Sequence, residues 1–282
     1  MQDTIAVIFD FDETLAPDST SSFLDSIGTD VRAFWQAVVQ PRLDSGWDPV
    51  PAYLYEMIQT SRLGGKQPAI TREALQAWGP RVQLYPGAAT IFRRLRKHAK
   101  LVSAGVQVEF YLISSGIGEI LRTTKIANNF TDIWACEFHY SSMGGIEFPK
   151  NVVSFTDKTR YIFQISKGLF GSSSRNAPFD VNRKIGERDL RIPLDQMIFV
   201  GDGYTDIPCF SLLRKGGGTA IGVYDKENRD KWGRAWGFIE DGRVSNLVPA
   251  DYSKGSALTN SLMMAISSIA GRIALRGKIY QG

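Results

Sequence analysis

The chain has 282 residues, 43% of them hydrophobic, which suits a core domain with a smaller companion. Its 33 basic and 29 acidic residues give a formal net charge of +4, and no long block of one sign occurs. This balance weakly favours small anionic ligands and gives no support for a nucleic-acid-binding protein. We therefore expect no nucleic-acid partner.

The two cysteines, Cys136 and Cys209, lie far apart and outside any metal-binding spacing. Their number and spacing exclude a disulfide framework and a zinc site, and two core thiols fit a reducing compartment. We expect no cleavable signal, because no basic region is followed by a long apolar run near Met1, and no segment long enough to span a membrane. These features predict a cytoplasmic protein with no membrane partner.

The stretch IAVIFDFDETLAPD, residues 5–18, is the prime candidate for a functional site. Its apolar residues Ile5 to Phe9 predict a buried parallel strand that ends at Asp10 and Asp12. Two carboxylates side by side repel each other, and a hard divalent cation such as Mg²⁺ compensates for that repulsion. The pattern therefore favours a metal site at the end of this strand.

A segment of helical character follows, from Ser19 to about Gln83. VRAFWQAVV and PAYLYEMI repeat apolar residues at helical spacing, TREALQAW opens with a threonine cap, and glycine and proline mark the joins. We expect residues 19–83 to form a helical cap domain, inserted into an α/β core domain of residues 1–18 and 84–282. Its aromatic residues suggest cap-core packing or, as an alternative, a cage for a quaternary ammonium group. They are Trp35, Trp47, Tyr53, Tyr55 and Trp78.

Strands and helices alternate in the rest of the chain. The predicted elements are a helix at 85–98, a strand at 106–113, a helix at 116–128, a strand and hairpin at 133–155, a helix at 156–169, a loop at 171–191, a strand and helix at 196–215, a strand at 219–224, a helix at 226–232 and a helix at 256–275. This order predicts a Rossmann-like, doubly wound, mostly parallel α/β sheet. The last helix is expected to pack on the core, with a contact between copies of the chain as the alternative.

Polar residues stand at the ends of three predicted strands. Asp10 and Asp12 follow the first, Ser114 follows the strand at 106–113, and GDGYTD, residues 201–206, follows a later one. Lys158 opens a helix between them. Open parallel sheets bind ligands at the carboxyl ends of their strands, where carboxylates can hold Mg²⁺ and a hydroxyl and an ammonium can surround a phosphate.

The ordered set DFDET, Ser114, Lys158 and GDGYTD resembles the four motifs of the haloacid dehalogenase (HAD) superfamily. It is most similar to the phosphoserine phosphatase-like branch, which has a helical C1-type cap and a GDGxxDxP fourth motif, matched here by Gly201 to Pro208. The motifs cover few residues but span most of the chain. The resemblance implies the HAD fold and a phosphatase that acts on a small phosphorylated metabolite.

The resemblance also implies a role for each motif residue. Asp10 would be the nucleophile that forms an aspartyl-phosphate, and Asp12 would be the general acid and base. Mg²⁺ would be held by Asp10, the backbone carbonyl of Asp12 and Asp202, with Asp206 in support. Ser114 and Lys158 would bind the phosphoryl oxygens. Thr14, Gly116 and Gly201 would support the site.

Asp12 favours phosphate-ester hydrolysis over dehalogenation, because the leaving alcohol needs an acid. The substrate is less well defined. Phosphoserine phosphatases carry a cap glutamate nine residues beyond the nucleophile, whereas this chain has Ser19 there, and Arg62 is a possible substrate clamp. A phosphotransferase of the same superfamily and a catalytically idle binding module are the alternative functions.

Overall fold

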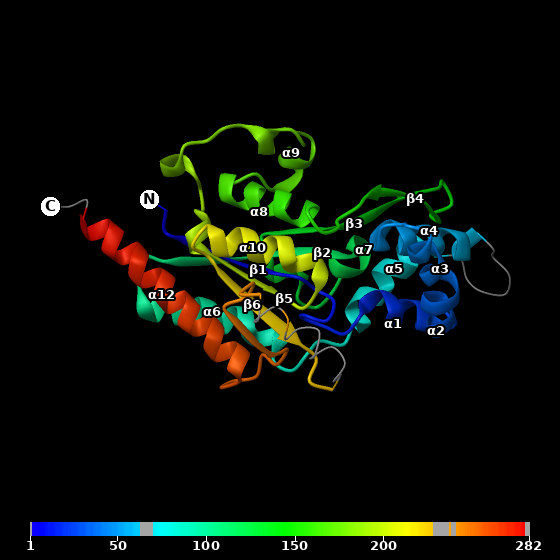
Figure 1. Ribbon diagram of the computed structural model, residues 1–282, viewed down its shortest axis with the longest axis horizontal. Helices are drawn as coiled ribbons and strands as arrows, with labels where there is room; N and C mark the ends of the chain where they lie inside the picture. Colours follow the sequence, from blue (N-terminus) through cyan, green and yellow to red (C-terminus); the bar gives the residue numbers. More distant parts are fainter. Residues whose placement is uncertain (1, 63–69, 228–236, 238–240, 280–282) are drawn as a thin grey trace.

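The computed structural model describes residues 2–62, 70–227, 237 and 241–279. A seven-stranded sheet lies at its centre (Figure 1). The strand order is β4-β3-β2-β1-β5-β6-β7, and every neighbouring pair is parallel except β3 and β4. The predicted mostly parallel α/β sheet is therefore confirmed. The strands are β1 (Thr4–Phe9), β2 (Gln107–Ile117), β3 (Asp132–Tyr140), β4 (Ile146–Asn151), β5 (Met197–Gly201), β6 (Thr219–Tyr224) and β7 (Asn246–Pro249).

Helices cover both faces of this sheet. On one side α6 (Ala88–Val102) and α12 (Ala257–Ile279) pack together, and on the other lie α8 (Asp157–Lys167) and α10 (Ile207–Lys215), with the short α9 (Gly171–Arg175) beyond them (Figure 1). The middle strand β1 is covered on both faces, and its side chains from Ile5 to Phe9 are fully buried. Burial of each large apolar side chain contributes about 1.5–3 kcal/mol, so the end of β1 is a firmly fixed point.

The helices of the segment 19–83 lie together at one end of the sheet (Figure 1). They are α1 (Ser19–Ser26), α2 (Val31–Ala33), the π-helical turn Phe34–Val39, α3 (Gln40–Asp44), α4 (Pro49–Arg62) and α5 (Arg72–Trp78). The predicted threonine cap is confirmed, because the Thr71 side chain accepts a hydrogen bond from the Ala74 N–H at 3.1 Å. The division into a core and a cap domain stays a prediction.

Two predicted boundaries are wrong around β2. The strand continues to Ile117 through an irregularity, because Ile117 still pairs with Cys136 of β3, and the helix after it, α7 (Gly118–Leu121), is much shorter than 116–128. The Thr123 and Thr124 hydroxyls donate to carbonyls of the preceding turn and so compete with a continued helix.

One further difference and one untested element concern the C-terminal third. The edge strand β7 is absent from the predicted elements because it has only four residues and ends in Pro249, which cannot donate to a ladder. The helix predicted near 226–232 lies outside the described residues.

The helix α12 corrects the expectation that no segment reaches the length of a membrane span. Its part Ala257–Arg276 is long enough and, with a mean hydropathy of 1.3, apolar enough to cross a membrane by length and composition alone. However, α12 packs against α6, β1 and β7, and the core helix of a soluble protein has the same properties. Its buried apolar side chains are Leu258, Leu262, Ile266, Ile269 and Ala270. Packing against the sheet and α6 accounts for these residues, and the predicted packing of this helix against the sheet is confirmed.

The turn before α6 requires a glycine. Gly87 has φ +76°, and a Cβ atom there would lie 2.2 Å from the Tyr252 carbonyl oxygen. We expect Gly87→Ala to lower the free energy of unfolding by more than about 2 kcal/mol, because it adds left-handed strain to a backbone clash. Urea unfolding measures this. Gly105→Ala is the control, since no atom lies within 4 Å of its Cβ position. Equal stability of the two variants would contradict the expectation.

Candidate active site

The two aspartates of the first motif are held by backbone groups at the end of β1. The Asp10 N–H donates to the Val200 carbonyl of β5 at 2.9 Å, and its Oδ1 accepts from the Phe11 N–H at 2.7 Å. Asp12 Oδ1 accepts from the backbone N–H of Ser19, the first residue of α1, at 2.7 Å. A helix N-terminus favours a negatively charged partner, so this contact suits a carboxylate.

Lys158 reaches this point from the first turn of α8 and is fully buried. Its Nζ donates to Asp10 Oδ2 at 2.8 Å and to Asp206 Oδ1 at 2.7 Å. Burial alone would lower the pKa of Lys158, but the two carboxylates raise it above its ordinary value. The side chain is therefore a permanent ammonium between two motif aspartates.

Three carboxylates gather around this ammonium. Asp10, Asp202 and Asp206 each offer an oxygen atom, and these oxygens lie within 4.8 Å of one another. Burial, together with the charges of Asp206 and Asp10, raises the pKa of Asp202 well above its ordinary range, and burial raises that of Asp206 to about 7. One ammonium does not balance three carboxylates, and oxygen donors at this spacing suit a hard divalent cation. The donor set therefore fits Mg²⁺.

Ser114 and the predicted glycines lie against the same residues. The buried Ser114 Oγ accepts from the Gly116 N–H at 3.0 Å, and a Cβ atom on Gly116 would lie 2.6 Å from Asp12 Oδ2. A Cβ atom on Gly201 would lie 2.3 Å from Asp206 Oδ2. Both positions therefore need glycine so that the carboxylates keep their places. The structure brings these parts of the motifs together, while their chemical roles stay predictions.

Thr14 and Arg62 make hydrogen bonds to segments outside the cluster of carboxylates. The Thr14 carbonyl accepts from the Tyr252 hydroxyl at 2.9 Å, which ties the turn after β1 to the segment before α12. Arg62 is exposed at the end of α4, where its Nη2 donates to the Glu147 carbonyl of β4 at 3.3 Å. Within the described part of the chain, Arg62 has no contact with the motif residues. Its role as a substrate clamp stays a prediction.

Tyr53 of α4, one of the five aromatic residues named from the sequence, lies against β2 beside this site, a contact that the sequence patterns did not indicate. Its hydroxyl donates to the Ser115 carbonyl at 2.5 Å, next to the phosphate-binding candidate Ser114. Burial raises the pKa of Tyr53, so the phenol stays a neutral hydrogen-bond donor. The sequence shows that the helical segment is rich in aromatic residues, but it does not indicate which ring reaches β2.

The five rings of the predicted cage separate into three groups. Trp35 contacts Tyr53, with ring centroids 5.9 Å apart, and Trp78 contacts Phe23. Trp47 and Tyr55 pair with each other, and the Arg42 guanidinium lies over both rings. The five rings therefore do not form one cluster, and the cage for a quaternary ammonium group stays a prediction. Packing within the helical segment, which was the simpler interpretation, accounts for them.

Comparisons with known proteins agree with this fold. No family model matches the chain. An uncharacterized protein of Borreliella burgdorferi is 26% identical over 290 residues, which cover 94% of this chain and 97% of that protein. Among solved structures, a HAD family hydrolase of Salmonella enterica serovar Typhi has a TM-score of 0.54 at 14% identity and covers 87% of this chain and 67% of its own.

Two phosphoserine phosphatase structures are similar as well. One, a phospho-aspartyl intermediate analogue, has a TM-score of 0.53 at 14% identity and covers 93% of this chain and 98% of its own. A probable phosphoserine phosphatase from Vibrio cholerae has a TM-score of 0.55 at 10% identity and covers 96% of this chain and 67% of its own. The chain has the HAD fold. Within that class, its fold is of the phosphoserine phosphatase type.

Proposed function

We propose that the protein is a Mg²⁺-dependent phosphatase that hydrolyses a small phosphomonoester through an aspartyl-phosphate on Asp10. The observation that supports this most strongly is the buried Lys158 ammonium, which contacts both Asp10 and Asp206 beside a third carboxylate, Asp202. Burial of so many charges in one place is costly unless the site uses them. The HAD phosphatase fold of the similar structures agrees with the proposal.

Asp10 is positioned to act as the nucleophile. Lys158 holds one oxygen of its carboxylate and the Phe11 N–H holds the other, so the orientation of the group is fixed before substrate binds. Attack on phosphorus forms the Asp10–phosphoryl bond and releases the alcohol. Ser114 and Lys158 bind phosphoryl oxygens. When bound, Mg²⁺ would be held by Asp10, the Asp12 carbonyl and Asp202, with Asp206 in support, and would supply positive charge against the repulsion between carboxylate and phosphate.

Asp12 would serve as the acid and then as the base. Desolvation raises its pKa to about 8, the nearby Asp18 carboxylate adds to the shift, and the Ser19 N–H opposes it. A raised pKa favours the protonated carboxyl group, which is the form that can give a proton to the leaving oxygen. Once ionised, the same group takes a proton from the water that hydrolyses the aspartyl-phosphate.

The substrate is proposed only as a small phosphomonoester. Ser19 is fully buried, its backbone N–H is taken by Asp12, and within the described residues its hydroxyl has no hydrogen-bond partner. A serine there supplies no carboxylate for a substrate amine, so phosphoserine is not favoured. The cytoplasmic location and an oligomer formed through α12 stay predictions.

Metal removal tests the proposal. We expect hydrolysis of p-nitrophenyl phosphate to stop when EDTA removes divalent cations and to return with added Mg²⁺, because the uncompensated carboxylates then repel the phosphate. The measurement is the release of p-nitrophenol. Asp202→Asn should raise the Mg²⁺ concentration needed for half-maximal activity, and Asp241→Asn on the exposed surface is its control. Full activity in EDTA would contradict the metal requirement.

The same assay separates hydrolysis from phosphotransfer. A phosphatase releases inorganic phosphate and p-nitrophenol in equal amounts, whereas a phosphotransferase given an acceptor alcohol releases less phosphate than p-nitrophenol. A panel of phosphorylated metabolites that includes phosphoserine and phosphocholine then ranks the substrates by kcat/KM.

A further inference from the structure

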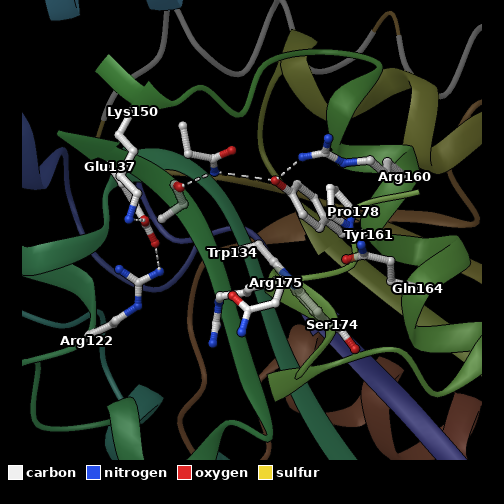
Figure 2. Close-up of a pocket in the computed structure, with 13 residues that line it drawn as sticks. Arg122, Trp134, Glu137, Lys150, Arg160, Tyr161, Gln164, Ser174, Arg175 and Pro178 are labelled. Carbon is white, nitrogen blue, oxygen red and sulfur yellow. Dashed lines mark hydrogen bonds and ion pairs between the residues drawn. The ribbon is translucent and has the colours of Figure 1, made fainter. Parts of the chain in front are cut away.

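A hollow of about 350 Å³ lies among β3, β4, α8 and the end of α9 (Figure 2). We call it the basic pocket and define it by Arg122, Glu137, Lys150, Arg160, Gln164 and Arg175. Its lining includes none of the motif residues of the candidate active site. A hollow of this size falls at the lower end of the range for small-molecule sites.

Positive charge dominates the basic pocket. Its four cationic side chains are Arg122, Lys150, Arg160 and Arg175. Glu137 lies 2.5 Å from Arg122 Nη2 and 3.8 Å from Lys150 Nζ, and Arg175 pairs with Asp132 just outside the lining. Four cations therefore face two carboxylates. The remaining excess charge attracts an anion of charge −2 or more.

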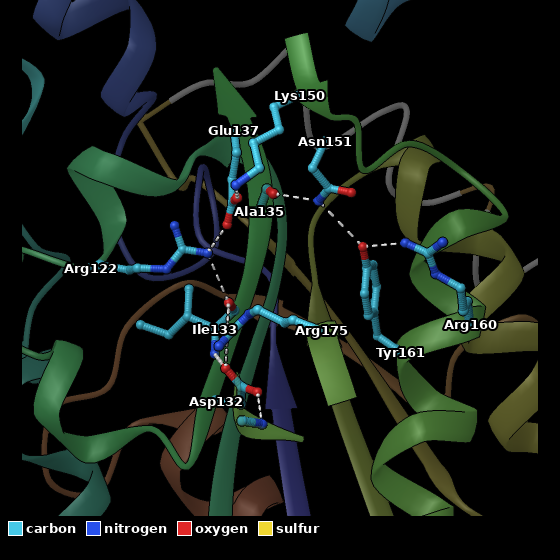
Figure 3. A network of polar contacts seen from close by, with 11 residues as sticks. Arg122, Asp132, Ile133, Ala135, Glu137, Lys150, Asn151, Arg160, Tyr161 and Arg175 are labelled. Atoms are coloured by element: carbon cyan, nitrogen blue, oxygen red, sulfur yellow. Dashed lines mark hydrogen bonds and ion pairs between the residues drawn. The ribbon is translucent and has the colours of Figure 1, made fainter. Parts of the chain in front are cut away.

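A hydrogen-bond network holds these groups in place (Figure 3). Tyr161 Oη accepts from Arg160 Nη2 at 2.5 Å and from Asn151 Nδ2 at 3.4 Å, and Asn151 also donates to the Ala135 carbonyl. The Tyr161 ring stacks on Trp134 at 5.2 Å, which gives the pocket a rigid wall. Donors fixed in this way lose little entropy when they bind a ligand.

Several donors of the pocket have no partner. Gln164 lines the hollow, and within the described part of the chain its side-chain amide makes no hydrogen bond and is open to the hollow. Arg160 Nε is buried and likewise has no partner among those residues. The Tyr161 hydroxyl accepts two hydrogen bonds, which leaves its own proton to donate. Buried polar groups are usually satisfied, so unsatisfied donors that line a cationic hollow point to an acceptor-rich ligand.

We propose that the basic pocket binds a small phosphate-bearing anion with two or more negative charges. Guanidinium groups match phosphoryl oxygens in geometry and charge, and the pocket has three. Its volume suits a small molecule and not a nucleic-acid strand. The site does not depend on the proposed reaction, although α8 carries Lys158 as well as Arg160 and Gln164.

Calorimetric titration with pyrophosphate tests the pocket. EDTA is included so that no metal bridges the probe to the acidic cluster at Asp10. We expect one binding site, with an affinity that falls as KCl is added. The variant Lys150→Gln with Arg160→Gln, and separately Gln164→Glu, should weaken binding by about tenfold or more, through lost attraction or direct like-charge repulsion.

The matched control is Arg93→Gln with Lys97→Gln, which removes the same charge from the exposed surface of α6. It should bind pyrophosphate like the wild type, and Gln164→Glu should keep the wild-type rate with p-nitrophenyl phosphate. Thermal unfolding checks that each variant folds. No binding to the wild type at millimolar pyrophosphate, or equal losses in both double variants, would overturn the proposal.

Discussion

The Asp10→Asn variant is expected to lose at least about 10³-fold in kcat/KM for p-nitrophenyl phosphate, since removal of a nucleophile costs at least this much in enzymes with covalent intermediates. An amide does not attack phosphorus, so no aspartyl-phosphate forms. The fold should survive, because the oxygen of the introduced amide can still accept from Lys158 or from the Phe11 N–H, and Asp206 remains paired with Lys158.

Asp25→Asn is the matched control for this variant, because Asp25 is an exposed residue of α1 outside the site. It should hydrolyse the substrate at the wild-type rate. The decisive measurement combines initial rates with a thermal unfolding curve for each variant. If the folded Asp10→Asn variant kept even a tenth of the activity, the nucleophile would have to be another group.

The Lys158→Met variant is expected to lose both activity and stability. Methionine fits the volume of the buried side chain, but Asp10, Asp202 and Asp206 then face one another without an ammonium. Loss of one partner from a buried ion pair typically costs about 3–5 kcal/mol, because the remaining charge stays buried and uncompensated. We therefore expect the free energy of unfolding at neutral pH to fall by about that amount.

The pH dependence of this loss identifies its cause. Without Lys158 the carboxylates have folded-state pKa values raised above those of the unfolded chain, so the folded state binds protons more readily. The deficit against the wild type should then be largest at and above neutral pH and should shrink as the pH falls toward the ordinary carboxyl range. Urea unfolding at several pH values measures it, with Lys97→Met as the exposed control. A deficit that does not change with pH would indicate lost packing instead.

The sequence was sufficient to predict the sheet, because the signals were strong and local. The apolar run Ile5 to Phe9 in β1, the alternation of strands and helices and the Thr71 cap all depend on residues that are near one another in the chain. The predicted helix at 116–128 failed because the continued pairing of Ile117 with Cys136 is a tertiary contact that overrides helical propensity. The strand β7 was too short for its pattern to be detected.

The main residues of the candidate site could also be predicted from the sequence, whereas some of its contacts could not. The motifs indicated Asp10, Asp12, Ser114 and Lys158, and the structure places their side chains around one point at the end of β1. The contact of Tyr53 with Ser115 spans 62 residues and has no local pattern, so it could not be predicted. The basic pocket could not be predicted for a similar reason, because its cations come from four separate elements of the chain. These are the end of α7, β4, α8 and α9.

The hydrogen bond from the Ser19 backbone to Asp12 restricts how this fold can be recombined. A chimera that replaces the helical segment with one from another protein would have to keep the first turn of α1, because that turn orients the carboxyl group assigned to proton transfer. A junction placed before Ser19 would replace the first turn of α1 together with the rest of the helical segment. Asp12 would then lose the backbone N–H that orients it. A junction after α1 would keep this hydrogen bond and exchange the helices farther along the chain, among them α4 with the Tyr53 hydroxyl that contacts Ser115.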